Sequence, residues 1–246
     1  MKKGHVSSHR RAPHGEQTRI HILDCAEMVC AEEGLEAVSV RAVVERAKVN
    51  LGAVTYHFGS KQGLLEAMFR RRVVPMNEKR LVLLSSCEGR SGPGAIKSIV
   101  SAFVTPPLTL WKEEGCSAHT PVAISHFLSR AFVSPGERDF LSKYYEPVRS
   151  RFIAALWECV PELEEAEVLW RYNLMVGALV YALGGSERMA RPPEAYSNRV
   201  GPLNVDDRIA IAYMVEFISA GFMAPPARAS TMSTQGSPEA WPPGEG

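Results

Sequence analysis

A short stretch in the first quarter of the chain gathers side chains that suit contact with a polyanion and with base edges. Tyr56 offers a phenolic donor, and Lys61 offers a point charge at an expected helix start, where backbone N–H groups also attract anions. Asn50, Ala53 and Thr55 are short enough to reach base edges or a thymine methyl group. The pattern therefore favours phosphate binding at some positions and base reading at others.

Five further residues of the same stretch belong to this candidate site. Arg41 and His57 are additional phosphate candidates, and Lys48 adds a cation in the turn between them. Gly52 has no side chain, which permits a close approach of backbone to a ligand. Ser39 can donate a hydrogen bond in addition to capping a helix.

Each of these residues also has an ordinary structural interpretation. Tyr56 could pack between helices, and Arg41 could lie on a solvated helix face. Asn50 could serve only as a helix cap, and Thr55 could be a plain surface residue. Phe58 is expected in the core. The pattern as a whole is more informative than any single member.

The first element that must position these side chains is a helix over residues 16–33. Its apolar residues recur at the i, i+3, i+4 and i+7 spacing of one buried stripe. That stripe consists of Ile22, Cys25, Ala26, Val29 and Cys30. Gly34 is the expected left-handed stop of this helix.

Two short helices follow, separated by a three-residue turn at positions 48–50. Ser39 can cap the first, and Asn50 can cap the second, which is expected over 51–57. The core face of the first consists of Val40, Val43, Val44 and Ala47. Two short helices across a tight turn, braced by longer helices, form a helix-turn-helix unit. The second would enter a major groove with its N-terminal residues toward base edges.

A long fourth helix is expected after this unit. Gly59 ends the preceding helix, Ser60 can cap the next, and the helix then runs from Lys61 into the low eighties. Its buried stripe consists of Leu64, Leu65, Met68 and Phe69. This helix would brace the unit and lead into the rest of the chain.

The segment 39–65, SVRAVVERAKVNLGAVTYHFGSKQGLL, closely resembles the DNA-binding head of the tetracycline-repressor (TetR) family. The family pattern is Ala-Gly-Val-Ser, x-Gly-x-x-Tyr-x-x-Phe and Lys-x-x-Leu. The residues that carry the resemblance here are Ala47, Val49, Asn50, Gly52, Tyr56, Phe58, Lys61 and Leu64, with Tyr56 one position later than the pattern places its tyrosine. One departure is Lys48, where the family often has Gly. If that position needs a positive φ, Lys costs about 1 kcal/mol there.

Charge is distributed unevenly along the chain. Residues 1–80 contain 14 Lys and Arg against 9 Asp and Glu, a net +5. The remainder contains 14 against 18, a net −4. A basic first third suits a nucleic-acid partner. Five cysteines without a Cys-x-x-Cys pair indicate neither a disulfide framework nor a zinc ribbon, although a thiol redox sensor stays open.

The remainder of the chain has helical periodicity nearly throughout, which predicts an all-α fold of about nine helices. Five helices are expected beyond the fourth, at 93–104, 121–133, 136–159, 162–184 and 206–223, with breaks or first turns at Pro106-Pro107, Pro121, Pro135 and Pro161. The predicted organisation is a flexible basic arm (1–15), a helix-turn-helix domain (16–60), a ligand-binding and dimerisation domain (61–223) and a disordered tail (224–246).

The last two helices are apolar on most sides. In the first, one face consists of Leu169, Tyr172, Val176, Val180 and Leu183, and the opposite side is also apolar, with Leu174, Met175, Leu179 and Tyr181. In the second, Ile211, Val215, Ile218 and Phe222 share a stripe, with Ile209, Met214 and Phe217 off it. Such helices must be buried on most sides, either within one monomer or in a four-helix bundle of a homodimer, as the family resemblance implies.

A ligand pocket is expected among the middle helices. The candidate residues are Phe103, Trp111, Cys116, His119, His126, Phe127, Arg130, Trp157 and Met175. An ordinary core or surface role is open for each. The stretch 127–183 resembles the sensor domain of a TetR subgroup tied to fatty-acid metabolism, which implies a small, largely apolar effector, with an acyl compound as one candidate.

The sequence thus predicts a repressor that binds a palindromic double-stranded operator as a homodimer and is released by an effector. An activator of the same architecture and a non-specific DNA-binding protein stay open. No Gly-x-Ser-x-Gly, His-Glu-x-x-His or phosphate-loop motif occurs, so neither an enzyme, a metal site nor a cofactor is expected. The longest apolar stretch is too short to span a bilayer, and no signal peptide is evident, so a cytoplasmic protein without a membrane partner is predicted.

Overall fold

The computed structural model describes residues 14–109, 138–196 and 206–227. Within these ranges the chain forms eight α-helices and one short 3-10 helix, with no strand, which confirms the all-α prediction. The helix expected over 121–133 lies outside the described residues. So does the arm expected over 1–15, apart from its last two residues, which open the first helix.

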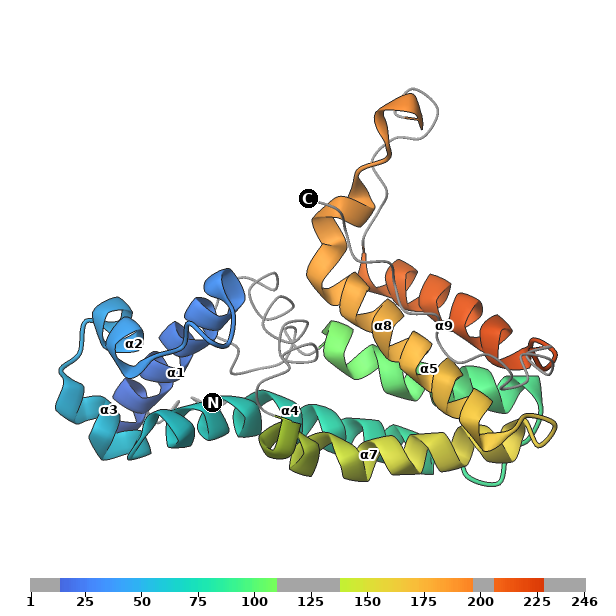
Figure 1. Cartoon of the computed structure of the whole chain (residues 1–246), viewed down its shortest axis with the longest axis horizontal. Helices are drawn as coiled ribbons and strands as arrows, with labels where there is room; N and C mark the ends of the chain where they lie inside the picture. Colours follow the sequence, from blue (N-terminus) through green and yellow to red (C-terminus); the bar gives the residue numbers. More distant parts are fainter. Residues whose placement is uncertain (1–13, 110–137, 197–205, 228–246) are drawn as a thin grey trace, which may run out of the picture.

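The three N-terminal helices pack into a compact unit, which we call the head (Figure 1). They are α1 (His14–Glu33), α2 (Val40–Ala47) and α3 (Leu51–Phe58). The predicted stops and starts agree with these bounds to within two residues. Gly34 follows α1 with φ 101°, the left-handed conformation expected of a helix stop. The stripe of α1 is buried together with Val43, Ala47 and Val54.

The turn between α2 and α3 contains a left-handed residue. Lys48 has φ 54° and ψ 37°, and it is the one non-glycine residue with positive φ in the described part of the chain. A Cβ makes this conformation unfavourable by about 1–2 kcal/mol. The departure from the family's Gly therefore falls at a position where the backbone conformation favours Gly.

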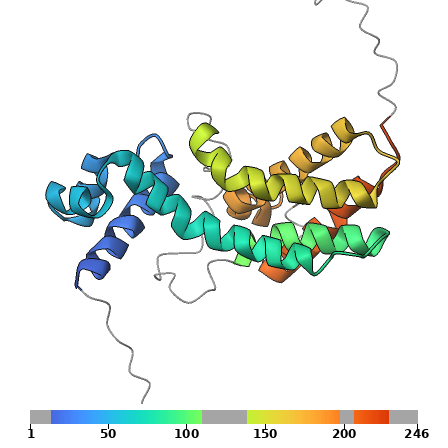
Figure 2. The ribbon, with the colours of Figure 1, turned by 90° about the horizontal axis from the view of Figure 1, so that it is seen from below.

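Helix α4 (Lys61–Ser85) runs from the head along most of the molecule (Figures 1 and 2). Its first turns pack against α1 and α3, and its later turns pack against α5 and α7. Pro75 lies inside the helix, and it cannot donate to the carbonyl oxygen of Arg71 four residues earlier. The proline thus separates a head half of α4 from a body half.

Two ion pairs, one buried and one half-buried, fasten the head half of α4 to α1. Arg72 donates from Nε and Nη2 to the two carboxylate oxygens of Glu27, at 2.9 and 2.8 Å. Arg71 Nη1 lies 2.7 Å from Asp24 Oδ1. A bidentate arginine–carboxylate pair fixes relative orientation as well as contributing energy. The head and the first half of α4 are therefore joined by directional contacts.

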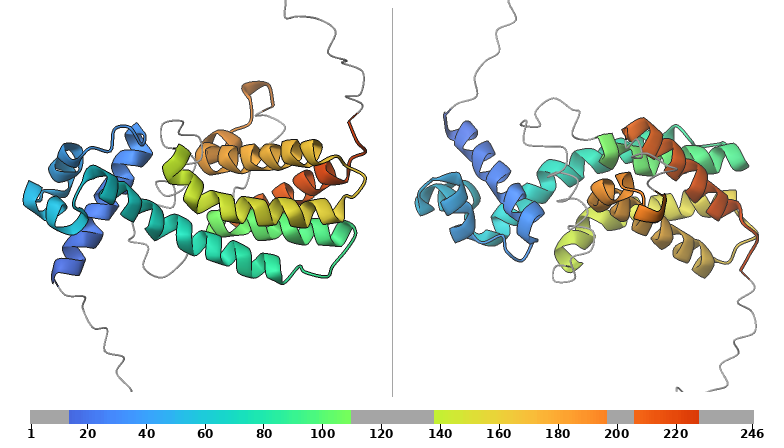
Figure 3. Two further views of the ribbon diagram at one scale, coloured as in Figure 1. Left: turned by 60° about the horizontal axis from the view of Figure 1, so that its bottom comes forward. Right: turned by 90° about the horizontal axis from the view of Figure 1, so that it is seen from above.

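The remaining helices form the body (Figures 2 and 3). They are α5 (Pro93–Thr109), α7 (Arg138–Cys159), α8 (Glu165–Ala190) and α9 (Asp207–Met223), with the 3-10 helix η3 (Glu194–Tyr196). α5 lies centrally and contacts α4, α7, α8 and α9. The last turns of α8 rise away from the other helices, and η3 lies beyond them (Figure 1).

The break predicted at Pro106-Pro107 is wrong, because α5 continues through both prolines to Thr109. A proline in a helix leaves the carbonyl oxygen four residues earlier without its N–H donor. Pro107 does this to Phe103, and Arg80 of α4 donates from Nε to that oxygen at 2.9 Å. The replacement donor comes from a distant segment, so the local sequence could not indicate it.

The predicted faces of α8 and α9 need correction at three residues. Met175, Leu179 and Met214 are buried within the monomer, whereas the prediction placed Met175 and Leu179 opposite the main stripe of α8 and Met214 off the stripe of α9. The buried residues of α8 are Val168, Tyr172, Met175, Leu179 and Leu183. This stripe still has helical spacing, but it is rotated by about one residue from the predicted one.

The start of the tail expected to be disordered is held against α8. Arg171 donates from Nη1 and Nη2 to the carbonyl oxygens of Ala224 and Pro225, at 2.8 and 2.9 Å. Glu167 accepts from the backbone N–H of Ala227 at 2.9 Å. Residues beyond 227 lie outside the described part of the chain.

Candidate nucleic-acid interface

Helix α3 lies at the end of the molecule farthest from the body (Figure 1). Val54 is its buried residue, which fixes the helix against the core of the head. The rest of its surface is open, with Leu51 60% and Tyr56 84% exposed. All ten predicted contact residues lie in α2, α3, their N-caps, the intervening turn or the first position of α4.

Three consecutive helices begin with a side-chain cap. Ser39 Oγ accepts from Ala42 N at 3.1 Å, and Asn50 Oδ1 accepts from Ala53 N at 2.8 Å. Ser60 Oγ accepts from Gly63 N at 3.1 Å. The predicted capping roles are therefore confirmed by geometry. They leave the Ser39 hydroxyl proton and the Asn50 amide N–H groups as outward donors.

The exposed residues of α3 differ in what they can offer. Thr55 Oγ1 donates to the Leu51 carbonyl oxygen at 3.2 Å, which leaves its methyl group and acceptor lone pairs for a partner. His57 is half-buried, with its ring 5.0 Å from the Tyr56 ring in an edge arrangement. The Tyr56 ring itself is not buried between helices, which disfavours the packing alternative.

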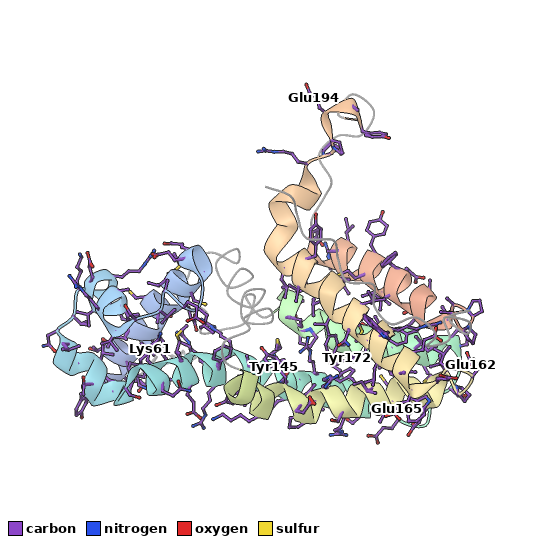
Figure 4. All side chains as sticks on the ribbon, in the orientation of Figure 1. Lys61, Tyr145, Glu162, Glu165, Tyr172 and Glu194 are labelled. Carbon is purple, nitrogen blue, oxygen red and sulfur yellow. The ribbon has the colours of Figure 1, made fainter. Side chains whose placement is uncertain are left out.

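A fringe of exposed cations surrounds α3. Arg41 precedes it on α2, Lys48 lies in the turn, and Lys61 opens α4 (Figure 4). None of the three forms an ion pair with any carboxylate in the described residues. Lys61 lies in the first turn of α4, where the unpaired N–H groups of a helix start also attract anions. The arrangement suits a phosphate backbone on both sides of α3.

Two glycines keep this region compact. A Cβ on Gly52 would lie 3.2 Å from Asn50 Oδ1, so the missing side chain leaves room for the cap. A Cβ on Gly63 would lie 2.0 Å from the carbonyl oxygen of Phe58. Gly63 was not among the predicted site residues. Its position three residues after Ser60, where a capped backbone N–H is expected, was the feature of the sequence that could have pointed to it.

Sequence reasoning also missed two braces inside the head. The ring Nε2 of His21 forms a hydrogen bond of 3.0 Å with the Ala47 carbonyl oxygen at the end of α2. Arg46 donates to both carboxylate oxygens of Glu32 at 2.6 and 2.7 Å. Both contacts join α1 to α2, and thereby fix the helix that precedes the turn.

The predicted pocket residues are only partly within the described chain. Phe103 is buried, and its ring meets those of Phe152 and Tyr172 edge-on at 5.1 and 5.5 Å. Met175 is also buried, whereas Trp157 is 40% exposed on α7, which does not favour a role in a pocket wall. The other six candidates, Trp111, Cys116, His119, His126, Phe127 and Arg130, lie outside the described residues.

Two family models match the chain. Residues 22–68 match the model described as "Bacterial regulatory proteins, tetR family". Residues 101–221 match the model described as "Tetracyclin repressor-like, C-terminal domain". The chain belongs to the tetR family of bacterial regulatory proteins. The first match contains α2, α3 and the start of α4, which are the elements that carry the candidate interface.

Individual tetR-family proteins are similar over shorter or more divergent stretches. The HTH-type transcriptional regulator BetI of Paraburkholderia xenovorans (strain LB400) is 34% identical over 122 residues, which cover 43% of this chain and 57% of that protein. The chain thus matches little more than half of this curated relative, and only 28% of a BetI from Paraburkholderia phymatum.

Two solved structures have the same fold. A TetR-family regulator from Shewanella sp. PV-4 superposes with a TM-score of 0.54 and 17% identity, covering 83% of this chain and 95% of that one. The regulator FadR from Bacillus subtilis, solved in complex with stearoyl-CoA, gives 0.54 and 14% identity, covering 82% and 98%. In the described ranges, none of the helices combines the length with the hydropathy that a membrane span requires.

Proposed function

We propose that this chain is a transcriptional repressor that binds a palindromic DNA operator as a homodimer and leaves it when a small, largely apolar effector binds. In this proposal residues 16–60 are the DNA-binding domain and residues 61–223 bind the effector and the second subunit. The observation that carries it is the exposed helix α3, capped by Asn50 and flanked by the cations Lys48 and Lys61.

The base-reading surface of this proposal is the N-terminal half of α3. A recognition helix presents its first residues to base edges, while residues around it hold the phosphate backbone. Asn50, Ala53 and Thr55 are the base-contact candidates. Ser39, Arg41, Tyr56, His57 and the two lysines are the phosphate candidates, and Gly52 allows close approach.

The outer faces of α8 and α9 support dimerisation. Trp170, Leu174 and Phe217 are 70%, 67% and 77% exposed, respectively. They line a groove of about 1270 Å³ between the two helices, together with Ala178 and Gly221. Large apolar patches of this kind mark interaction sites. In a twofold-symmetric pair, α8 and α9 of each protomer would form a four-helix bundle that sets the spacing of the two heads.

Effector release requires a conformational difference that both sites sense. Helix α4 is the candidate link, because its first half is ion-paired to α1 and its second half packs against α5 and α7. An effector shifts the equilibrium only by its difference in affinity for the two states. An acyl effector is supported by the sequence resemblance of residues 127–183 and by the stearoyl-CoA complex of the similarly folded FadR.

The phosphate-contact prediction is tested by removing Lys61. Lys61→Ala should weaken binding to the operator and to unrelated duplexes by a similar factor, because a phosphate contact carries no sequence information. Gel shifts with the promoter upstream of the chain's own gene, against competitor DNA, provide the measurement. Arg90→Ala is the matched control, since it removes an exposed cation in the turn that follows α4, far from α3 in the sequence. Equal affinity of the unmodified protein for all duplexes would refute specific operator binding.

The base-contact prediction is tested by Thr55→Ala in the same assay. The substitution should relax discrimination at particular operator positions, because it removes a methyl group and a hydroxyl that face away from the core. Each lost base contact is expected to reduce discrimination by about 1–3 kcal/mol. An unchanged preference profile across a randomised operator library would contradict base contact by Thr55.

A further inference from the structure

Arg80 is the most deeply buried charged residue of the described chain, with 1% of its surface exposed. It lies in the body half of α4 and points into the core. Its Nε donates to the Phe103 carbonyl oxygen at 2.9 Å, the oxygen that Pro107 leaves without a helical donor. One of the five N–H donors of the guanidinium therefore has an acceptor supplied by the fold.

The rest of the guanidinium is not matched in the same way. Its Nη2 atom is fully buried and has no hydrogen-bond partner among the residues that the structure describes. Within the same ranges, no carboxylate forms an ion pair with Arg80. A buried cation without a counter-charge costs several kcal/mol, so such groups are normally paired. Arg72, two turns earlier on α4, meets this expectation through Glu27.

Among the described residues, those that contact Arg80 or influence its charge are aromatic. The guanidinium carbon lies 3.9 Å from the centre of the Phe103 ring. Tyr145 and Tyr172 are close enough to influence its charge electrostatically, and both lie in the body (Figure 4). Burial lowers the pKa of Arg80 to about 10 and raises the pKa of Tyr172 to about 12. At neutral pH the arginine is therefore charged and the tyrosine is not.

We infer that Arg80 is the anchor for the anionic group of a ligand, a carboxylate or a phosphate, bound in the core of the body. The guanidinium fork matches the oxygens of either group through parallel N–H donors. The rings of Phe103 and Phe152, which meet edge-on at 5.1 Å, offer apolar contact for the remainder of the molecule. This inference rests on the proposed effector-binding function and makes it more specific, because the effector would be an amphipathic anion.

The test uses three probes with twelve carbon atoms each: dodecanoate, dodecyl phosphate and dodecan-1-ol. Calorimetric titration into the full-length protein without DNA should show at least one anion binding about tenfold or more tightly than the alcohol. A charge-assisted hydrogen-bonded contact supports a difference of this size. The better of the two anions identifies the head group. Equal affinities for all three, or binding of none, would overturn the inference.

Arg80→Gln then assigns the preference to this residue. The variant should lower the affinity of the preferred anion about tenfold to a hundredfold and leave dodecan-1-ol unchanged. Arg90→Gln, which removes an exposed cation, is the matched control and should change neither. If Arg80→Gln does not fold, Arg80→Lys should retain a weakened anion preference. A full preference in either folded variant would exclude Arg80 as the anchor.

The two proposals can fail separately. Binding of the probes is measured without DNA, so failure of operator binding would leave the Arg80 result intact. Conversely, if the protein binds its operator but shows no preference for the anionic probes, the proposed regulatory function stands and the inference about Arg80 is wrong.

Discussion

The two halves of α4 bury arginine in different ways. On the head side, Arg72 meets Glu27 through two hydrogen bonds, and Arg71 meets Asp24. On the body side, Arg80 meets a carbonyl oxygen and an aromatic face, with no described carboxylate as a partner. In the head half, Arg71 and Arg72 are thus paired with carboxylates of the protein. In the body half, Arg80 carries a positive charge that a bound anion could neutralise.

This contrast separates two requirements of the proposed function. A head that reads DNA must hold its helices in one arrangement, and bidentate ion pairs provide this directionality. A body that senses an effector must change its stability or shape when a ligand arrives. A buried cation that has no counter-charge in the described protein meets the second requirement. A bound anion is stabilised most where the protein supplies no carboxylate of its own.

The largest effect is expected from breaking the head-side pair. Glu27→Gln should lower the free energy of unfolding by about 3–5 kcal/mol, because it removes the carboxylate that pairs with the buried guanidinium of Arg72. Urea denaturation followed by circular dichroism measures the change. Glu32→Gln is the matched control: it also removes a bidentate arginine partner, but Glu32 is 48% exposed. Its cost should be about 1 kcal/mol or less. Equal costs for the two variants would remove the contrast between buried and exposed pairs.

An intermediate effect is expected where the head meets α4. Gly63→Ala places a Cβ against the Phe58 carbonyl oxygen, which lies 2.0 Å from the ideal position. The resulting displacement of backbone should destabilise the protein by about 1–3 kcal/mol. In the body, Gly94 is also in the first turn of a helix, yet nothing lies within 4 Å of its Cβ position. Gly94→Ala should therefore be neutral or stabilising by up to about 1 kcal/mol. Thermal unfolding of both variants measures these changes. An unchanged stability of Gly63→Ala would contradict the close contact between the Gly63 position and the Phe58 carbonyl oxygen.

The smallest effect concerns the turn inside the head. Lys48→Gly should stabilise the protein by about 1 kcal/mol, because Lys48 adopts the left-handed conformation that glycine accepts at no steric cost. The same change should weaken binding to all duplexes if Lys48 contacts a phosphate. Measuring both unfolding and DNA affinity separates the two roles. A gain in stability with unchanged affinity would leave Lys48 without a binding role.

The head was predicted closely because its signals are local. Ser39, Asn50 and Ser60 cap helices a few residues away, and Gly34 ends α1 through its own backbone conformation. Such signals can be read from neighbouring residues alone. Gly63 shows the limit, since its constraint comes from a carbonyl oxygen that only the folded junction brings close.

The body was predicted less well because its contacts are distant along the chain. The continuation of α5 through Pro106 and Pro107 depends partly on Arg80, which lies on another helix. Burial of Met175 and Met214 depends on how α8 and α9 pack, which periodicity leaves uncertain by about one residue. An arginine in a sequence is ordinarily a surface residue, so Arg80 gave no indication of its place in the core.

Pro75 divides α4 at a point that matters mechanically. Lys61 lies fourteen positions before it, so this arm of the helix is about 21 Å long at 1.5 Å per residue. A tilt of about 5° at the proline would swing the far end by about 2 Å, more than half of the roughly 3.4 Å between successive base pairs. In a twofold pair the two arms would swing in senses related by the twofold axis, so that a rearrangement of side-chain size in the body would shift both heads relative to the base pairs.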